Sequence, residues 1–352
     1  MNTQVLPVDE DSLALAARLL SAGELVAFPT ETVYGLGANA FDPKAVLNIF
    51  AAKGRPADNP LIVHIWDRGQ LKDIGEVTPM AERLMDAFWP GPLTLLFRRN
   101  EKIPLEVTAG LDTVAVRMPS HPDAAAMLKA CNLPIAAPSA NRSGKPSPTT
   151  AAHVLRDMEG RIPLILDGGP CQVGVESTVL DITGEVPCIL RPGGITRHML
   201  EEVLGQVDVA GSVLRPLKAG EKALSPGMRY KHYSPDGQVY LVEGEESRVV
   251  SALRQLCREA EQQGHRACVM CHTEHVAALR DCTPHDIGRM SDPAAAARCL
   301  FDTLRRLDDE KMDVIFSEVV DPEEMGLAVM NRLGRAAAFR TIRAEDVVSE
   351  AK

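Results

Sequence analysis

The sequence predicts an α/β protein with two domains of unequal size that are joined by a linker. Short apolar runs punctuated by Pro and Gly indicate buried strands, and segments with helical spacing lie between them. Both patterns stop near residue 205 and resume after residue 236. The chain has 352 residues, which is enough for two domains of ordinary size.

The first domain is expected to span residues 1–205 and to be built on one large sheet. It opens with an apolar helical pattern at 11–20, and a strand follows at 25–28. Further apolar runs have the length of buried strands at 61–65, 93–97, 113–116, 134–137, 164–166 and 178–182. Helical patterns separate several of these runs, at 44–52, 81–88, 122–130 and 149–157. This mixture is typical of an α/β sheet domain.

Residues 206–236 are expected to form an interdomain linker. Gly, Pro, Ser and isolated charges dominate most of this stretch and leave no sustained period. Over residues 237–352 the patterns resume, with strands predicted at 239–242, 267–271 and 313–320 and helices at 245–263, 292–307 and 323–338. Their order predicts a second, smaller α/β domain of doubly wound character.

Composition narrows the class of protein. Hydrophobic residues make up 45% of the chain and charged residues 24%, as in an ordinary soluble protein. No apolar run approaches the roughly 20 residues that a membrane span needs. The N-terminus lacks the basic and apolar regions of a signal peptide, so we expect a cytoplasmic protein without a membrane partner. Eight cysteines at scattered spacings predict free thiols.

The charge balance argues against nucleic-acid binding as the main activity. Lys and Arg number 38 against 48 Asp and Glu, which gives a net charge of −10, and the acidic excess extends over both halves of the chain. Tight non-specific binding to nucleic acid needs many cations that neutralise phosphates. Any contact with RNA is therefore expected to be weak or indirect.

The densest polar segment follows the first predicted strand. Residues 29–37 read PTETVYGLG and bring hydroxyls, a carboxylate and glycines to the end of that strand. In open α/β sheets ligands bind beyond the carboxyl ends of strands. Downstream, Lys53 and Arg55 flank one glycine at a helix end, which suits a phosphate or carboxylate ligand. Favourable charge at a helix C-terminus explains the same two cations equally well.

A third polar cluster is PSANRSGKPSPT at residues 138–149, in a turn-rich loop that opens a helix. Loop amides and helix N-termini bind anions, although a simple capped turn has the same composition. The segments GVEST at 174–178 and LRPGG at 190–194 each place polar groups at the edge of a strand.

Together these segments resemble the two-domain threonylcarbamoyl-AMP synthases, whose first domain is YrdC-like. The matching motifs are PTETVYGLG, KGRPADNPLIVHI, TVAVRMP, PSANRSGKPSPT, GVESTVLD and ILRPGG, in the right order across nearly all of residues 10–200. SPGMRYKHYSP at 225–235 resembles the family's interdomain motif, and GLAVMNR at 326–332 resembles the closing helix of its second domain. The resemblance implies a YrdC-like twisted open sheet, a linker and a C-terminal Rossmann-like domain.

The resemblance also implies a set of site residues. A threonine pocket is expected from Thr32, His64, Arg117, Ala137 and Ser177. Contacts to ATP are expected from Arg55, Asn59, Thr113, Ser139, Asn141, Ser147, Arg191 and Tyr230, with Lys53 and Arg55 as the catalytic cations and no residue as a metal ligand. Tyr230, with Tyr233 near it, is expected to reach from the linker onto the nucleotide, so that the linker acts as a lid.

The activity that the resemblance implies is the joining of L-threonine, bicarbonate and ATP into threonylcarbamoyl-AMP with release of pyrophosphate. Mg²⁺ bound through the nucleotide phosphates is the expected cofactor. A partner complex would then transfer the threonylcarbamoyl group to a tRNA adenosine next to the anticodon. The residue types fit this chemistry, because positioning and charge neutralisation supply most of the rate in such transfers.

Two other functions are alternatives. One is an RNA-binding YrdC-like module, against which the acidic excess argues. The other is a carbamoyl-transferring enzyme of the hydrogenase-maturation type, which also contains a YrdC-like domain. Those chains carry acylphosphatase-like and zinc-finger segments upstream, for which we expect no room before the first helix.

Three further patterns favour a structural interpretation. Residues 35–40 fit the dinucleotide pattern GxGxxA, but Pro43 interrupts any helix that would begin there. CVMCH at 268–272 fits a haem or zinc motif, yet its cysteines fall in a predicted strand and would point to opposite faces. His64 ends an apolar strand, where a histidine is usually structural, and only its motif favours a role in binding.

Overall fold

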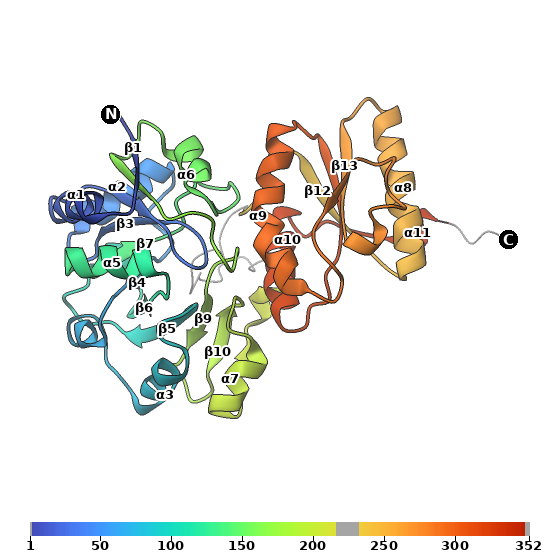
Figure 1. Ribbon diagram of the computed structural model, residues 1–352. Coiled ribbons are helices and arrows are strands. Elements are labelled where there is room, and N and C mark those ends of the chain that lie inside the picture. The colour runs from blue at the N-terminus through green and yellow to red at the C-terminus, as the bar shows by residue number, and fades with distance from the viewer. Residues whose placement is uncertain (1, 216–231, 349–352) are drawn as a thin grey trace. The chain divides into compact units, whose positions relative to one another are not determined.

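The computed structural model describes residues 2–215 and 232–348 (Figure 1). Its described residues cluster into two compact units. The first unit contains residues 2–213 apart from 144–146, and the second contains 232–348 together with 144–146 and 214–215. Tyr230, which was expected to reach the nucleotide, lies outside the described residues. The predicted boundaries at 205 and 236 stay predictions.

The first unit is built on one mixed sheet, which has eleven strands within the described residues. The strand order is β1-β8-β2-β3-β7-β4-β6-β5-β9-β10-β11. The strands are β1 (Gln4–Pro7), β2 (Val26–Phe28), β3 (Gly35–Asn39), β4 (Ile62–His64), β5 (Leu93–Arg98), β6 (Thr113–Arg117), β7 (Ile135–Ala137), β8 (Leu164–Asp167), β9 (Thr178–Asp181), β10 (Cys188–Arg191) and β11 (Asp208–Val209). All seven apolar runs predicted as strands in this domain are confirmed.

Helices cover the two faces of this sheet unevenly. They are α1 (Glu10–Ser21), α2 (Pro43–Lys53), α3 (Pro79–Phe88), α4 (Leu105–Thr108), α5 (Pro122–Cys131), α6 (Ala151–Met158) and α7 (Arg197–Leu204), with 3-10 turns η1 (Arg68–Asp73) and η2 (Gly211–Val213). Helices α1 and α5 pack together over β2, β7 and β8. The larger core forms with α2, α3, α6 and α7 and runs under β4, β6, β5 and β9. The opposite face of those four strands carries only a small apolar cluster.

Local sequence signals explain where helix α2 begins and ends. The Asp42 side chain accepts hydrogen bonds from the backbone amides of Lys44 and Ala45, and Pro43 occupies the first turn. The helix stops at Gly54, whose φ of 67° is a left-handed conformation that glycine adopts without steric cost. This ending places Lys53 in the last turn and Arg55 immediately beyond it.

The PTETVYGLG segment differs from the prediction in one respect. Its last residues form strand β3, which pairs antiparallel with β2, so the polar loop is confined to the few residues between them. Gly37 lies in β3 and does not open a helix. A Cβ atom there would lie 2.8 Å from the Ile135 side chain, so the glycine permits close strand packing.

The second unit contains a parallel sheet with the order β14-β13-β15-β12-β16. Its strands are β12 (Gln238–Glu243), β13 (Ala267–Cys271), β14 (Pro284–Asp286), β15 (Val314–Glu318) and β16 (Thr341–Arg343). The helical elements are α8 (Glu246–Gln262), η3 (Thr273–His275), α9 (Pro293–Asp309), α10 (Met325–Ala336) and α11 (Ala344–Val347). Helices α8 and α11 lie on one side of the sheet and α9 and α10 on the other (Figure 1), as the Rossmann-like prediction requires.

The cysteines of the CVMCH segment lie in strand β13, as predicted. Cys268 and Cys271 are both buried, and burial raises the pKa of each thiol to about 12. Among the described residues, the structure contains no helix with the length and apolar character of a membrane span.

Candidate functional site

A row of polar side chains crosses the sparsely covered face of the first sheet. His64 on β4 lies opposite Arg117 on β6, Arg117 lies opposite Thr94 on β5, and Thr94 lies opposite Val179 on β9. Val179 in turn lies opposite Arg191 on β10. Residues opposite each other in a regular ladder share a face, so His64, Arg117, Thr94 and Val179 project to the same side. Arg191 follows a register shift in β10, and its own hydrogen bonds to Ser177 place it beside the row. The strand order therefore brings three predicted site residues together.

An apolar floor lies beside this row on the same face. It consists of Ile62, Leu96, Ala115, Val179 and Leu190. Thr113 lies beyond the floor at the start of β6, four residues from Arg117, or roughly 13 Å along the strand. Thr113 and Arg117 are thus on one face but at opposite ends of it.

Arg117 is held in place from three directions. Its Nη1 donates to Thr32 Oγ1 at 2.7 Å, and its Nε donates to the Gly91 carbonyl at 3.3 Å. Its Nη2 lies 2.8 Å from Glu31 Oε1, and that carboxylate oxygen also accepts from the Ser120 amide at 3.1 Å. These contacts fix the orientation of the guanidinium group.

Glu31 is a site residue that the sequence analysis did not select, although its carboxylate was noted in the motif. Burial raises the pKa of this carboxyl, but the charge of Arg117 and its hydrogen bond lower it, and the net pKa is below the ordinary value. Glu31 is therefore a carboxylate at neutral pH. Its Oε2 atom is buried and has no hydrogen-bond partner among the described residues.

His64 is neutral in this environment. Burial lowers the pKa of its imidazole to about 3, and the charge of Arg117 contributes in the same direction. Its Nδ1 lies 3.1 Å from the Ile62 carbonyl, and its ring makes an edge contact with Phe28 at 5.8 Å between centroids. The structure thus places His64 beside Arg117 without adding a second positive charge.

Ser177 and Arg191 are joined directly. The Arg191 Nε donates to the Ser177 carbonyl at 3.1 Å, and Nη2 donates to Ser177 Oγ at 3.1 Å. Thr94 Oγ1 lies 2.8 Å from the same hydroxyl. The ILRPGG loop can approach because Gly193 lacks a side chain, since a Cβ atom there would lie 2.3 Å from the Thr178 amide nitrogen.

Lys53 links helix α2 to the loop that follows β7. Its ammonium donates to the Ser139 carbonyl and, at 2.6 Å, to the Asn141 carbonyl. Ser139 Oγ donates to Asn141 Oδ1 at 2.5 Å, and the Ser143 amide donates back to the Lys53 carbonyl at 3.1 Å. These bonds give Lys53 a role in shaping the loop, and its catalytic role stays a prediction.

The remaining predicted residues lie in the same unit. Arg55 stacks over the Phe50 ring at 5.3 Å. Ser147 Oγ donates to Glu176 Oε1, and Ala137 is buried in β7 opposite Ile62. Asn59 is 1% exposed, and neither its amide nitrogen nor its oxygen has a hydrogen-bond partner in the described part of the chain. A buried amide without partners is costly, and the contact of Asn59 with ATP stays a prediction.

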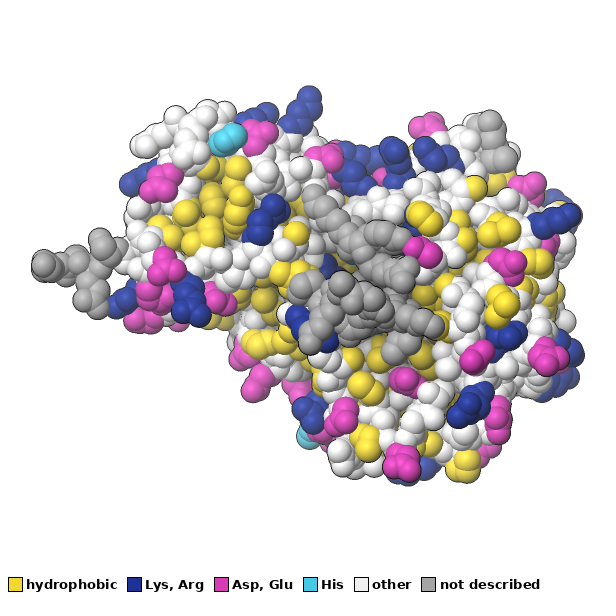
Figure 2. Space-filling model, turned by 180° about the vertical axis from the view of Figure 1, so that it is seen from behind, with side chains coloured by type: hydrophobic (Ala, Val, Ile, Leu, Met, Phe, Trp, Pro, Cys, Tyr) yellow, Lys and Arg dark blue, Asp and Glu magenta, His cyan; other side chains and the backbone are white. Residues whose placement is uncertain are grey.

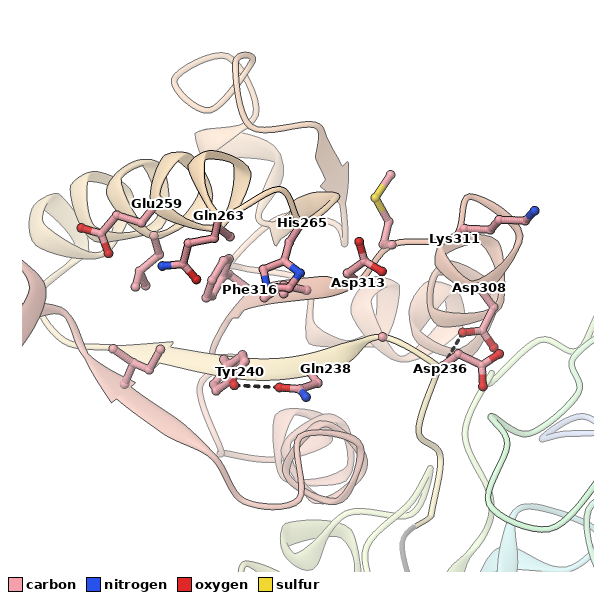
Figure 3. Close-up of a pocket in the computed structure, with 16 residues that line it drawn as sticks. Asp236, Gln238, Tyr240, Glu259, Gln263, His265, Asp308, Lys311, Asp313 and Phe316 are labelled. Carbon is pink, nitrogen blue, oxygen red and sulfur yellow. Dashed lines mark hydrogen bonds between the residues drawn. The ribbon is translucent and has the colours of Figure 1, made fainter.

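A separate cavity of about 690 Å³ lies in the second unit (Figure 3). Tyr240 and Phe316 stack at its wall with ring centroids 5.8 Å apart, and Glu259, Gln263 and Asp313 line it. None of the predicted site residues lines this cavity. Its acidic side chains make it a poor place for a phosphate group.

Two family models match the chain. A model described as "Telomere recombination" matches residues 18–193, and one described as "Threonylcarbamoyl-AMP synthase, C-terminal domain" matches residues 195–338. The fold and these two matches define a two-domain protein, in which the first domain carries the polar row and the second matches the C-terminal domain model.

Relatives that match nearly the full length of the chain show the family to which it belongs. The chain is 47% identical over 343 residues to the threonylcarbamoyl-AMP synthase of Bacillus subtilis, which covers 97% of each chain. It is 45% identical over 338 residues to that of Pyrococcus abyssi, which covers 96% of this chain and 97% of the relative. The crystal structure of P. abyssi Sua5 complexed with L-threonine matches 97% of this chain and 98% of that chain with a TM-score of 0.90 and 44% identity. The chain belongs to the threonylcarbamoyl-AMP synthase family.

Proposed function

We propose that this protein synthesises threonylcarbamoyl-AMP from L-threonine, bicarbonate and ATP, with release of pyrophosphate. The observation that carries the proposal is the buried polar row, in which His64, Arg117 and Thr94 lie in register beside Thr32 and Ser177. The relatives of the same length are named for this activity, and one has been crystallised with L-threonine.

The polar row suits a small amino acid. Arg117 Nη2 is buried and carries two N–H groups, and Glu31 Oε1 at 2.8 Å takes up at most one of them while neutralising the charge. A guanidinium N–H of this kind suits a carboxylate. Thr32, Ser177 and neutral His64 form polar walls for a short hydroxylated side chain, so L-threonine is the proposed substrate. One methyl group discriminates by only about 1–3 kcal/mol, so L-serine would react weakly.

ATP would lie across the same face. Asn59 offers a buried amide, and the Ser139–Asn141 loop offers polar groups that Lys53 holds in place. Arg55 and Arg191 would contact the phosphates, with Ser147 and Thr113 as further contacts. The apolar floor around Ala115 suits an adenine ring. Mg²⁺ would arrive bound to the phosphates, where it neutralises their charge.

The reaction needs positioning more than a nucleophilic side chain. The threonine amine adds to bicarbonate with loss of water, and an oxygen of the resulting carbamate attacks the α-phosphorus while pyrophosphate leaves. Carbamate and triphosphate are both anions, so the cations Arg55, Arg117 and Arg191 make their approach favourable. A carbamate is labile in water, so a buried site also protects the intermediate.

The product would pass to a separate complex that modifies a tRNA adenosine next to the anticodon, and we propose that this takes place in the cytoplasm. On the face in Figure 2, Lys and Arg side chains of the described residues lie among Asp and Glu side chains. Such mixed charge, with the net charge of −10, supports weak or indirect contact with tRNA and disfavours the RNA-binding alternative.

A direct assay tests this function. Purified protein is incubated with ATP, Mg²⁺, bicarbonate and labelled L-threonine, and chromatography is used to detect the adenylate. Omission of any substrate should abolish the product. Arg55→Ala should lower the rate by roughly two to three orders of magnitude, since a charge contact to the transition state is lost. Arg18→Ala, which alters an exposed arginine on α1, is the matched control and should be unchanged.

Two results would contradict the proposal. A complete set of substrates that yields no adenylate would exclude the activity. Binding of tRNA at physiological ionic strength, without any ATP turnover, would instead favour an RNA-binding module.

A further inference from the structure

The direction of the hydrogen bond between Thr30 and Thr32 follows from their partners. Both side chains are buried, at 2% and 0% exposure, and their Oγ1 atoms are 2.8 Å apart. Thr30 Oγ1 also lies 2.6 Å from the carbonyl oxygen of Val33. A carbonyl can only accept, so the single hydroxyl proton of Thr30 points to Val33. The 2.8 Å contact therefore needs the proton of Thr32, which Thr30 accepts together with two longer amide contacts at 3.2 Å.

The hydroxyl of Thr32 can therefore only accept hydrogen bonds from Arg117 and from a bound ligand. Its proton is directed to Thr30, and one of its lone pairs accepts from Arg117 Nη1 at 2.7 Å. One lone pair remains for a ligand. A ligand group that meets Thr32 can form a hydrogen bond only if it brings a proton.

We propose that Thr30 is a specificity-determining residue, because it fixes the proton of Thr32 and so requires a hydrogen-bond donor on the substrate. This inference rests on the proposed function. In L-threonine we assign this donor to the β-hydroxyl, because Thr32 belongs to the polar walls proposed above for the substrate side chain. Thr30 acts through Thr32 and does not touch the substrate, so it is a positioning residue.

A purely structural role for Thr30 makes a different prediction. Its Oγ1 also accepts from the backbone amides of Thr32 and Val33, both at 3.2 Å, and so closes the turn between β2 and β3. Loss of that turn would weaken the binding of every amino acid by the same factor. A change in the preference between donor and acceptor groups would arise only from the proton on Thr32.

The first experiment compares three substrates with the wild-type protein in the adenylate assay. They are L-threonine, 2-aminobutanoate, in which hydrogen replaces the hydroxyl, and 2-amino-3-fluorobutanoate, in which fluorine can accept but cannot donate. We expect kcat/KM for threonine to exceed that for 2-aminobutanoate at least tenfold, because a buried acceptor is left unpaired. The fluoro compound should be no better than 2-aminobutanoate, since its fluorine faces the lone pair of Thr32.

The second experiment repeats the series with Thr30→Val and Thr30→Ser. Valine preserves the shape but removes the oxygen, so the Thr32 proton becomes free to turn toward the ligand. The fluoro compound should then gain at least about threefold in kcat/KM relative to 2-aminobutanoate. Serine retains the hydroxyl and should restore the wild-type order. Each comparison is a ratio within one variant, so partial unfolding cancels.

The outcomes separate the two proposals. If threonine gives no adenylate, the proposed function fails. If threonine reacts but the wild-type protein prefers the fluoro compound to 2-aminobutanoate, the inference about Thr30 is wrong. An unchanged ratio in Thr30→Val would also overturn it. Should Thr30→Val not fold, the wild-type series still tests whether Thr32 acts only as an acceptor, and a preference for the fluoro compound there overturns the inference.

Discussion

Arg117 Nη2 lies 2.8 Å from Glu31 Oε1, and the two side chains are only 3% and 5% exposed. The carboxylate thus neutralises a cation at the centre of the polar row. It also ties the loop after β2 to the segment after β6, because the same oxygen accepts from the Ser120 amide. Removing one member of such a pair should change the stability of the protein, and the size of that change should depend on pH.

The first prediction concerns the pair itself. Glu31→Ala should lower the free energy of unfolding by about 3–5 kcal/mol, because it leaves the charge of Arg117 buried without a partner. Glu24→Ala, at an exposed glutamate before β2, is the control and should change it by less than about 0.5 kcal/mol. Urea denaturation measures both. Equal stability of the two variants would show that the pair is not stabilising.

The contribution of the Glu31–Arg117 pair to the free energy of unfolding should decrease as the pH falls. The folded pKa of Glu31 is below its ordinary value, so the pair stabilises the protein above pH 4.5 and the effect is lost as the pH falls further. The difference in unfolding free energy between wild type and Glu31→Ala should therefore shrink in acid. A difference that grows below pH 4.5 would contradict the assignment.

The second prediction uses His64. Its folded pKa of about 3 is below the ordinary 6.5, so unfolding takes up a proton as the pH falls below 6.5. Lowering the pH from 7.0 to 5.5 should cost the wild type about 1 kcal/mol more than His64→Gln, whose amide does not titrate. Guanidinium denaturation at the two pH values gives this difference. A wild type and variant with the same pH dependence would refute neutral, buried His64.

The third prediction concerns His275 in the second unit, whose pKa is shifted in the opposite direction to that of His64. Nδ1 of His275 lies 2.8 Å from Glu318 Oε1, and Nε2 lies 3.0 Å from Glu246 Oε1. Burial lowers the pKa of His275, but these two carboxylates raise it, and the net pKa is above the ordinary value. His272 also faces Glu318, at 3.9 Å.

Stability from this contact is present below pH 6.5 and is lost as the pH rises through the folded pKa. His275→Gln should therefore reduce the thermal stability at pH 6 more than at pH 8.5, as scanning calorimetry would measure. His265→Gln, at an exposed histidine before β13, is the matched control. A larger effect of His275→Gln at pH 8.5 would reverse the assigned sign.

The fourth prediction concerns Asn59, whose buried amide has no partner in the described residues. Asn59→Leu should raise the free energy of unfolding of the ligand-free protein by about 1 kcal/mol, because it removes unsatisfied polar atoms from a buried position. It should also weaken the binding of ATP at least tenfold. Urea denaturation and titration calorimetry measure the two effects. A variant that loses stability and keeps its ATP affinity would show that Asn59 is structural.

Most of the elements could be predicted from local sequence. The apolar runs at 61–65, 93–97 and 113–116 became β4, β5 and β6, because their length and punctuation leave few other structures. Strand β3 could not be predicted, since Gly35-Leu-Gly-Ala-Asn has neither alternation nor β-branched residues. The edge strands β1 and β16 are short and partly exposed, so their composition does not differ from that of a loop.

The sequence by itself determined the family, the order of elements and most of the candidate residues, because motifs such as PTETVYGLG are contiguous in the chain. Only the tertiary structure decided which of those residues meet. Thr94 was missed because nothing local distinguishes it, and it joins the row only because β5 lies between β6 and β9. The pairing of Glu31 with Arg117 and the direction of the Thr32 hydroxyl depend likewise on contacts between or within folded loops. Strand order and hydrogen-bond partners are properties of the folded chain, and hydrophobic periodicity carries no information about them.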